Sequence, residues 1–376
     1  MTKLLVVFAA SLVLAYISEL NTRAILASGH RYSVWNDWAY LLLLTILILF
    51  AGLRTSYNDT WNYMSAYKSA PVLKEFCSNA KNFNPFVNPL FSLYQSCLRS
   101  LGCSAQMLVL TSAAFTHICF LRFLKRYAAN FTFSVFIFFA LGTYAFTLAA
   151  IKQVLAMAVV TTAFPLLEQK KYVKYYLVVF IAMLLHTYVL AFIFLPLFTV
   201  RPWKSFTFVF IAITAVVVLN FEEAITAFME QANDLGKTLA EFEVFGDATI
   251  NMFRLGVYAV APLISFIFQQ WVFNDSSEMD HVLVHMSIIS FAFMCMGTQA
   301  GANMFGRMGN YFELGTICIL PQMLERIFDK RSYKLISGLA FVCFMGFFIY
   351  ANAIKLSFDI EYQSLSLMQF IRSLFA

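Results

Sequence analysis

Residues 38–53 read WAYLLLLTILILFAGL, an apolar run without a charge, and residues 54–63 directly after it read RTSYNDTWNY. A helix that crosses a bilayer uses about 17–25 predominantly apolar residues, so the first stretch predicts a membrane helix. The second stretch places an Arg, an Asp, two Asn and three aromatic residues where the lipid ends. This concentration of polar and aromatic residues at a helix end makes the segment the first candidate for a functional site.

The composition of the whole chain predicts a membrane protein. Of its 376 residues, 61% are hydrophobic and only 12% are charged. A soluble chain this apolar would aggregate. The apolar segments are too long for the alternating strands of a membrane barrel, which cover about ten residues each. We therefore predict an all-α, polytopic integral membrane helical bundle with about 11–13 transmembrane or re-entrant helices, forming one transmembrane domain over residues 1–376.

Thirteen segments are candidate spans. They are residues 4–20, 38–53, 86–101, 105–122, 131–148, 151–167, 173–188, 189–200, 206–220, 252–273, 282–298, 308–325 and 335–353. Residues 86–101 carry polar side chains and residues 189–200 form a short segment with a proline, so either is alternatively re-entrant or interfacial. The first span has neither a strongly basic start nor an obvious cleavage site, which predicts an uncleaved helix.

Basic loops set the expected orientation, because cytoplasmic loops of membrane proteins are rich in Lys and Arg. The basic residues expected in the cytoplasm are Arg122, Lys125, Arg126, Lys170, Lys171, Lys174, Arg201, Lys204, Arg326, Lys330, Arg331 and Lys334. Residues 54–85 and the acidic, amphipathic loop 221–251 are then expected on the outer face. An odd number of crossings must separate residues 54–85 from residues 122–126, which favours a segment 86–101 that does not cross.

Five cationic or titratable residues are expected near the outer boundary. They are Arg54, Lys152, His186, Arg254 and Arg307. Each charge at membrane depth costs roughly 2.5–3.5 kcal/mol on insertion scales, so a set at one level suggests a use. An anion held at the lipid surface is the obvious partner, and the fork of Arg binds phosphate through two oxygens.

Each of these residues has a structural alternative. Arg54 and Lys152 are alternatively interfacial side chains that reach toward water. Asp59 is alternatively a helix cap or the ion-pair partner of Arg54. Aromatic residues of this region also suit the membrane interface. The glycines Gly297, Gly301, Gly306 and Gly309 are most simply explained by close helix packing.

Several short motifs occur in a characteristic order. Arg54, Asp59 and Tyr63 follow an early span, and Asn88–Phe91 (NPLF) begins the next segment. Lys152 and Gln153 head a later helix, His186 and Thr187 end another, and Arg307 precedes Tyr311 and Phe312. This pattern resembles the EpsG-like, Wzy-type polysaccharide polymerases of bacterial membranes over residues 40–325. Two positions depart from the family pattern, since Lys152 replaces an Arg and the NPLF motif lacks a Gly.

The resemblance implies a GT-C-like glycosyltransferase of the bacterial inner membrane. It would transfer an oligosaccharide from undecaprenyl pyrophosphate to another lipid-linked repeat unit on the outer or periplasmic face. Neither a cofactor nor a metal is expected, and nucleic acid is not an expected partner. Besides the lipid-linked donor and acceptor and membrane lipid, a chain-length regulator is a candidate partner. O-antigen, capsule and exopolysaccharide all remain open as products.

Roles follow from this reaction. Asp59 and His186 are the candidate bases, with Asp59 first because it shares a motif with Arg54. Arg54, Lys152 and Arg307 are assigned to the pyrophosphate, and Arg254 is added on position alone. The residues assigned to the glycan are Trp61, Tyr63, Gln153 and Tyr311.

Three other functions stay open. A lipid-linked oligosaccharide flippase would carry cations along a cavity open to both sides, not gathered at one face. A membrane O-acyltransferase acting on surface glycans would use an intramembrane His, for which His117 and His186 are candidates. A ligase that joins polymer to a lipid A core would share much of the polymerase chemistry.

Overall fold

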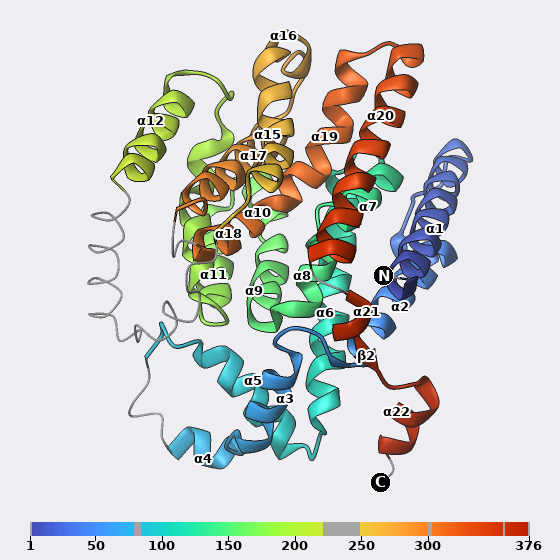
Figure 1. Ribbon diagram of the computed structural model, residues 1–376, viewed down its shortest axis with the longest axis vertical. Coiled ribbons are helices and arrows are strands. Elements are labelled where there is room, and N and C mark those ends of the chain that lie inside the picture. The colour runs from blue at the N-terminus through green and yellow to red at the C-terminus, as the bar shows by residue number, and fades with distance from the viewer. Residues whose placement is uncertain (1, 79–83, 221–248, 300–302, 356–357, 375–376) are drawn as a thin grey trace. The chain divides into compact units, whose positions relative to one another are not determined.

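The computed structural model describes residues 2–78, 84–220, 249–299, 303–355 and 358–374, and the chain forms two compact units (Figure 1). Unit 1 comprises Met1–Phe164, Leu177–Thr187 and Phe348–Ala376, and unit 2 comprises Pro165–Tyr176 and Tyr188–Phe347. Each unit is described by itself below. Most of the amphipathic segment expected at 221–251 lies outside the described residues.

Unit 1 is built from the N-terminal half of the chain and its C-terminal end. Its helices are α1 (Thr2–Ala27), η1 (Val34–Asn36), α2 (Trp38–Gly52), α3 (Thr60–Ser69), α4 (Leu73–Ser78), α5 (Pro89–Ser100), α6 (Ala105–Tyr127), α7 (Phe131–Ala140), α8 (Thr143–Ala149), α9 (Ile151–Thr161), η4 (Tyr350–Lys355), α21 (Phe358–Glu361) and α22 (Leu367–Leu374). Two short strands, β1 (Arg54–Ser56) and β2 (Gln363–Ser364), pair antiparallel. The remaining structure of this unit is helical.

Unit 2 holds most of the C-terminal half. Its helices are η3 (Thr187–Thr199), α12 (Ser205–Leu219), α15 (Met252–Ile267), α16 (Gln269–Val272), α17 (Glu278–Met296), α18 (Asn303–Asn310) and α19 (Glu313–Ile327). The residues of α10 (Phe164–Glu168), α11 (Tyr172–Met183) and α20 (Lys330–Ile349) are divided between the two units, and the first residue of η3, Thr187, belongs to unit 1.

The helices confirm the all-α polytopic class. In the described ranges, five helical segments are long and apolar enough to cross a membrane: Thr2–Ala27, Ala105–Tyr127, Ile151–Glu168, Glu278–Met296 and Lys330–Asn352. The bent pair α7 and α8, with 55° between its halves, is a sixth candidate. Five shorter apolar helices, α2, α11, η3, α12 and α15, have 10–17 residues. Among the expected spans, 86–101 and 308–325 have no counterpart in this set.

Contacts at the two ends of α2 and α6 show that these helices run antiparallel. Where α2 ends and α6 begins, the Gln106 amide donates to the carbonyl oxygens of Gly52 at 2.7 Å and Arg54 at 3.1 Å. At the other end, the Lys125 ammonium donates to the Ser18 hydroxyl at 2.8 Å, and Ser18 donates to Asp37 at the start of α2. The chain therefore leaves α2 and enters α6 at the same end of this helix pair. This arrangement agrees with the prediction that residues 86–101, which hold the 12-residue helix α5, do not cross.

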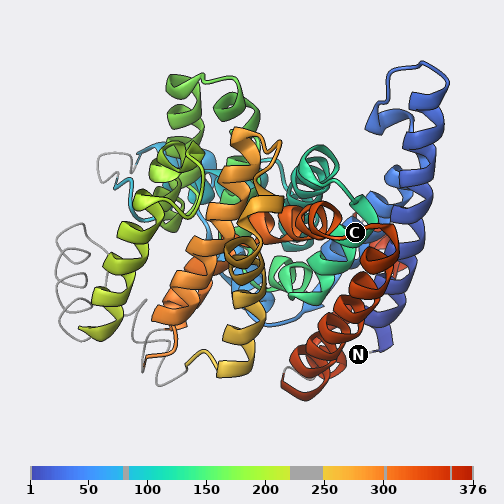
Figure 2. The same ribbon diagram turned by 90° about the horizontal axis from the view of Figure 1, so that it is seen from above.

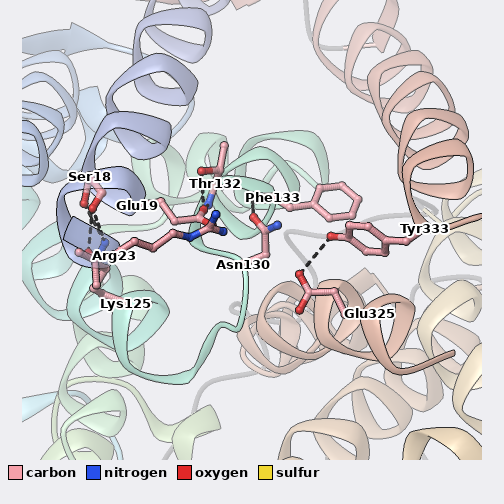
Figure 3. Close-up of polar contacts among 10 residues, drawn as sticks. Ser18, Glu19, Arg23, Lys125, Asn130, Thr132, Phe133, Glu325 and Tyr333 are labelled. Atoms are coloured by element: carbon pink, nitrogen blue, oxygen red, sulfur yellow. Dashed lines mark hydrogen bonds and ion pairs between the residues drawn. The ribbon is translucent and has the colours of Figure 1, made fainter. Parts of the chain in front are cut away.

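At the end of unit 1 that holds Lys125, polar side chains form a cluster, which Figure 3 shows in part. Glu19 accepts from the Thr132 hydroxyl at 2.7 Å and forms an ion pair with Arg23 at 2.5 Å. α1 and α2 pack side by side in Figure 1, and Figure 2 shows the loop that joins them at this end. The end of α1 that carries Arg23 thus lies beside the loop after α6, which agrees with the prediction that both are cytoplasmic.

Asp37 organises this cluster. Its carboxylate accepts from Ser18 at 2.6 Å, Asn21 at 2.9 Å and Tyr32 at 2.9 Å. It also caps α2 by accepting from the backbone N–H of Ala39 and Tyr40. Burial raises the pKa of Asp37, but these hydrogen bonds outweigh it and hold the pKa below its ordinary value. The carboxylate is therefore a stabilising group in its charged form.

We expect Asp37→Asn to lower the free energy of unfolding by roughly 1–3 kcal/mol at neutral pH, because the donors lose a charged acceptor. A carboxyl whose folded pKa is depressed stabilises above its unfolded pKa and loses that contribution as the pH falls through the folded value. The wild type should therefore lose stability below about pH 4, and the variant should show a flatter acid profile. Thermal unfolding in detergent between pH 3 and pH 7 measures both. Equal acid profiles would contradict the assignment.

In unit 2, basic residues from separate loops gather around the start of α17. Lys170 forms an ion pair with Glu278 at 2.7 Å, and Arg326 forms one with Asp280 at 2.8 Å. The Arg201 guanidinium lies 5.6 Å from the centre of the Phe273 ring. Three basic loops that the sequence assigned to one side thus meet at one end of this unit.

Glycines allow α17 to approach α18 and α19 closely. A Cβ at Gly309 would lie 2.9 Å from the Met294 side chain, and one at Gly297 would lie 3.1 Å from the backbone nitrogen of Gly306. The Ser290 hydroxyl donates to the Gly309 carbonyl at 2.9 Å, which holds the two helices together. The packing interpretation of these glycines is confirmed, while Gly301 lies outside the described residues.

Alanine substitutions at two glycines, one in a tight contact and one in open space, should differ strongly in their effect on stability. A Cβ at Gly315 would lie 2.4 Å from Met286 Cβ and 2.7 Å from the Leu283 carbonyl oxygen, whereas one at Gly346 meets nothing within 4 Å. We expect Gly315→Ala to destabilise unit 2 by about 1–3 kcal/mol through overpacking. Gly346→Ala is the matched control and should be neutral or slightly stabilising. Melting temperatures that fall equally in both variants would contradict this packing.

Candidate active site

The Arg54 side chain is enclosed by its own loop. Its Nε donates to the Thr60 hydroxyl at 3.0 Å, and a terminal nitrogen donates to the Ala51 carbonyl. Thr60 in turn donates to the carbonyl of Tyr57 at 2.7 Å. The result is a closed loop between α2 and α3 that leaves Arg54 only 1% exposed. The sequence assigned Arg54 to a pyrophosphate, which stays a prediction, and the structure places the guanidinium beneath the surface.

Arg54 has no carboxylate partner among the residues that the structure describes. The hydroxyl groups that influence its charge belong to Tyr362, Tyr144, Tyr63 and Tyr57. Burial lowers the pKa of Arg54 to about 10, so the side chain is still a cation near neutral pH. A buried charge with only neutral hydrogen-bond partners costs stability. Its field is also weakly screened, because little water separates it from its surroundings.

Lys152 joins three of the sequence motifs. Its ammonium nitrogen lies 6.0 Å from the centre of the Tyr63 ring and 5.8 Å from that of Phe91. The two rings meet edge to face, with their centres 6.0 Å apart. Lys152 is half-buried, and an ammonium over aromatic faces at this range is held by cation–π attraction. The Arg-Asp-Tyr loop, the NPLF segment and the start of α9 therefore form one cluster.

The start of α5 connects this cluster to the region of His186. The backbone N–H of Leu90 donates to the Leu184 carbonyl at 2.9 Å, and Leu184 is in the turn that leads to His186. Asn88 begins the segment with a left-handed φ of 56°. This conformation is one that Asn adopts more readily than most residues. It allows the chain to turn sharply into Pro89 and α5.

Two buried oxygen atoms near these positions have no hydrogen-bond partner in the described part of the chain. They are Asn88 Oδ1 at the start of α5 and Gln153 Oε1 on α9. Buried acceptors are nearly always satisfied, so an unmatched one calls for an explanation such as an absent water or ligand. Both groups suit the hydroxyl of a bound sugar, and Gln153 was one of the expected glycan residues.

Two structural roles were considered for Asp59, a helix cap and an ion pair with Arg54. It occupies the N-cap position of α3, but its side chain makes no capping hydrogen bond. Within the described ranges, its half-buried carboxylate forms no ion pair with Arg54 and no side-chain hydrogen bond. Trp61, two residues later, is 68% exposed. Both structural explanations of Asp59 therefore fail, and the carboxylate is available to an incoming hydroxyl.

His117 has a structural environment. It is completely buried, with Nδ1 2.7 Å from the Ala113 carbonyl oxygen and Nε2 3.3 Å from the Thr147 hydroxyl. Its ring meets Tyr144 edge to face, with their centres 5.5 Å apart. With both nitrogens engaged in the core, this histidine offers no support for the acyltransferase alternative.

Unit 2 contains a second polar cluster, around Arg254. Its guanidinium donates to Asn310 Oδ1 at 3.0 Å and lies 5.5 Å from the Tyr258 ring. The Tyr258 hydroxyl donates to Glu313, which is 2% exposed, while Arg254 Nε is buried without a partner in the described part of the chain. Sequence reasoning missed Tyr258, Asn310 and Glu313. Two signals pointed to them, namely the spacing of four between Arg254 and Tyr258 and an acidic residue in an otherwise apolar helix.

Two other expected site residues also lie in unit 2. Tyr311 is 1% exposed, and its ring centre lies 6.5 Å from that of Tyr188. Tyr311 is therefore buried in the core of this unit, and its assignment to the glycan stays a prediction. Arg307 is half-buried on α18. Because Arg254 and Arg307 belong to unit 2 and Arg54, Lys152 and His186 to unit 1, the convergence of all five stays a prediction.

Comparison with known proteins identifies the family. A family model described as the EpsG family matches residues 37–364, which is most of the chain and includes the clusters around Lys152 and Arg254. Neither the curated proteins nor the solved structures gave a match. The GT-C-like arrangement therefore stays a prediction. The family match agrees with the order of motifs in the sequence, and it assigns the chain to the EpsG family, whose members are Wzy-like polysaccharide polymerases.

Proposed function

We propose that this protein joins lipid-linked repeat units on the outer face of the bacterial inner membrane. The donor would be an oligosaccharide on undecaprenyl pyrophosphate, and the acceptor would be the non-reducing end of another lipid-linked repeat. One observation carries the proposal. Lys152, Tyr63 and Phe91 meet at the end of unit 1 opposite the basic cluster around Lys125, directly beside the buried Arg54 loop.

The reaction needs a base and a way to stabilise the leaving group. A hydroxyl oxygen of the acceptor sugar attacks the anomeric carbon of the donor. The bond from that carbon to the pyrophosphate oxygen breaks, and the hydroxyl proton passes to Asp59. His186 is the second candidate for the proton. The leaving lipid pyrophosphate carries the negative charge that develops.

Two cations would stabilise this negative charge in different ways. Lys152 is half-buried and its ammonium can approach a phosphate oxygen directly. Arg54 contributes a fixed positive field from beneath, where water cannot screen it. Tyr63 and Trp61 supply rings for sugar stacking, and Gln153 supplies the unmatched oxygen. Arg254 and Arg307 are assigned to further phosphate contacts in unit 2.

The role of Lys152 predicts a graded series of variants. Lys152→Ala should reduce polymerisation by roughly 10²–10³-fold, by analogy with the removal of one preorganised group that stabilises developing charge. Lys152→Arg should retain most activity, because a guanidinium binds phosphate at least as well as an ammonium. Lys174→Ala, at an exposed position in the first turn of α11 that is expected on the cytoplasmic side, is the control for loss of a positive charge. Normal polymer length in Lys152→Ala would remove this residue from the site.

The function itself is tested by a gel of surface glycan from a strain that lacks the protein, with and without the wild-type copy. A single-repeat band that becomes a ladder on complementation supports polymerisation. Loss of every repeat, restored as a whole, would identify an exporter. An unchanged ladder with altered acyl content would identify an acyltransferase.

A further inference from the structure

The C-terminal end of the chain folds back onto the Arg54 loop. β2 pairs with β1 in a register that sets Arg54 opposite Ser364 and Ser56 opposite Gln363. Just beyond β2, the backbone N–H of Leu365 donates to the Leu53 carbonyl at 2.9 Å. α21 and β2 lie together beside the strand that follows α2 (Figure 1). We call residues 358–365 the C-terminal clasp.

Aromatic contacts fix the clasp to the residues on either side of Arg54. The Tyr362 ring stacks on Phe50 with centres 4.4 Å apart, and its hydroxyl donates to the Phe50 carbonyl at 2.6 Å. On the other side of the loop, Phe358 packs against Tyr57 with centres 4.8 Å apart. Phe358 is fully buried and Tyr362 is 2% exposed. Together these contacts close the loop on both sides of the guanidinium.

The start of the chain holds the clasp from a second direction. The backbone nitrogen of Thr2 donates to Asp359 Oδ2 at 2.7 Å. The Lys3 ammonium donates to the Tyr362 carbonyl at 3.5 Å and lies 5.6 Å from the centre of the Tyr362 ring. The N-terminal residues of α1 and the β1 strand thus fix the clasp from two sides.

We propose that the clasp positions Arg54 for catalysis and that Tyr362 is its main positioning residue. This inference rests on the proposed function, because it gives the buried cation a role toward a leaving pyrophosphate. Without the clasp, β1 would be an unpaired edge and water would reach the guanidinium. Water would weaken the field that Arg54 applies to the site, and the loop that carries Asp59 and Tyr63 would lose its fixed position. A displacement of about 1 Å in a positioned group is enough to cost roughly 10²-fold in rate.

The first test measures the position of Arg54 without any assay of activity. Phenylglyoxal modifies accessible arginines, and mass spectrometry reports which ones have reacted in the full-length protein in detergent. Arg54 should be protected in the wild type, while the exposed Arg23 reacts. Leu365→Pro removes the N–H that bonds Leu53 and should make Arg54 at least tenfold more reactive. Leu365→Ala trims the same side chain but keeps the N–H, and should leave Arg54 protected.

The second test separates positioning from simple stability. Tyr362→Ala should lower kcat/KM for the lipid-linked donor by roughly 10²-fold. Tyr362→Phe keeps the stacked ring and should recover most of that loss. Tyr16→Ala removes an exposed tyrosine of α1 and serves as the control for protein level. Activity is normalised to the amount of folded protein in the membrane, so that a loss of protein alone leaves the normalised value unchanged.

The outcomes distinguish the clasp from the reaction. If Arg54 stays protected in both Leu365→Pro and Tyr362→Ala, the clasp does not position it and the inference fails. Equally, reactive Arg54 with an unchanged normalised rate would overturn the catalytic role of the clasp. If the wild type itself makes no polymer, the proposed function fails, while the phenylglyoxal result still reports whether the clasp encloses Arg54.

Discussion

Arg54→Ala should abolish the polymer ladder and leave a single-repeat glycolipid. The substitution removes the buried cation and leaves the Ala51 carbonyl and Thr60 hydroxyl without their donors, so it affects both the field and the loop. Loss of one preorganised charge-stabilising group costs roughly 10²–10³ in rate. Arg54→Lys keeps the charge but cannot reproduce both hydrogen bonds from one planar group, and should have intermediate activity.

The control for Arg54 is Arg23→Ala. Arg23 is 70% exposed in its side chain and forms an ion pair with Glu19 on the same helix. Exposed ion pairs contribute little, so this variant should polymerise normally. The measurement is the length distribution of surface glycan in a deletion strain, normalised to protein level. A normal ladder in Arg54→Ala would exclude Arg54 from the reaction.

Asp59→Asn should have an effect of similar size for a different reason. The amide has the shape of the carboxylate but cannot accept the proton of the acceptor hydroxyl, and general-base catalysis is worth about 10²–10⁴-fold. Because the Asp59 side chain makes no cap and no ion pair with the described residues, we expect the melting temperature to stay unchanged. Donor binding should also persist, so the loss should appear in kcat and not in KM.

Asp37→Asn provides the opposite case for comparison with Asp59→Asn. Both aspartates occupy N-cap positions, but only Asp37 has hydrogen bonds to lose. The Asp37 variant should be less stable yet active at low temperature, and the Asp59 variant should be stable yet inactive. If Asp59→Asn polymerises normally, His186 becomes the first candidate for the base.

Much of the site could be predicted from the sequence because its motifs are short and local. Arg54, Asp59 and Tyr63 lie within ten consecutive residues, and the apolar run before them places that stretch at the end of a helix. Positive loops determined which ends of the helices belong together, and the contacts of Lys125 and Gln106 agree with that pairing. The prediction that segment 86–101 does not cross followed from the same parity.

Burial was not predictable from these patterns. Arg54 and Tyr311 were expected to face a ligand, and both are enclosed by residues distant in the chain. Glu313 and Asn310 were missed because a polar residue in a helix does not reveal which partner it meets. The clasp was missed for the same reason, since residues 358–365 lie more than 300 positions from the loop they cover, as the separation of 312 between Tyr362 and Phe50 shows.

The sequence by itself determined that this protein is a helical membrane protein, which ends of its helices are basic, and which motifs it shares with the EpsG family. Those properties depend on composition, on the length of apolar runs and on local order, all of which are written in consecutive residues. Only the tertiary structure decided that Arg54 is buried, that Lys152 meets Tyr63 and Phe91, and that the C-terminal clasp pairs with the strand that carries Arg54. Enclosure and contact depend on side chains that arrive from distant segments, and packing in three dimensions alone selects them.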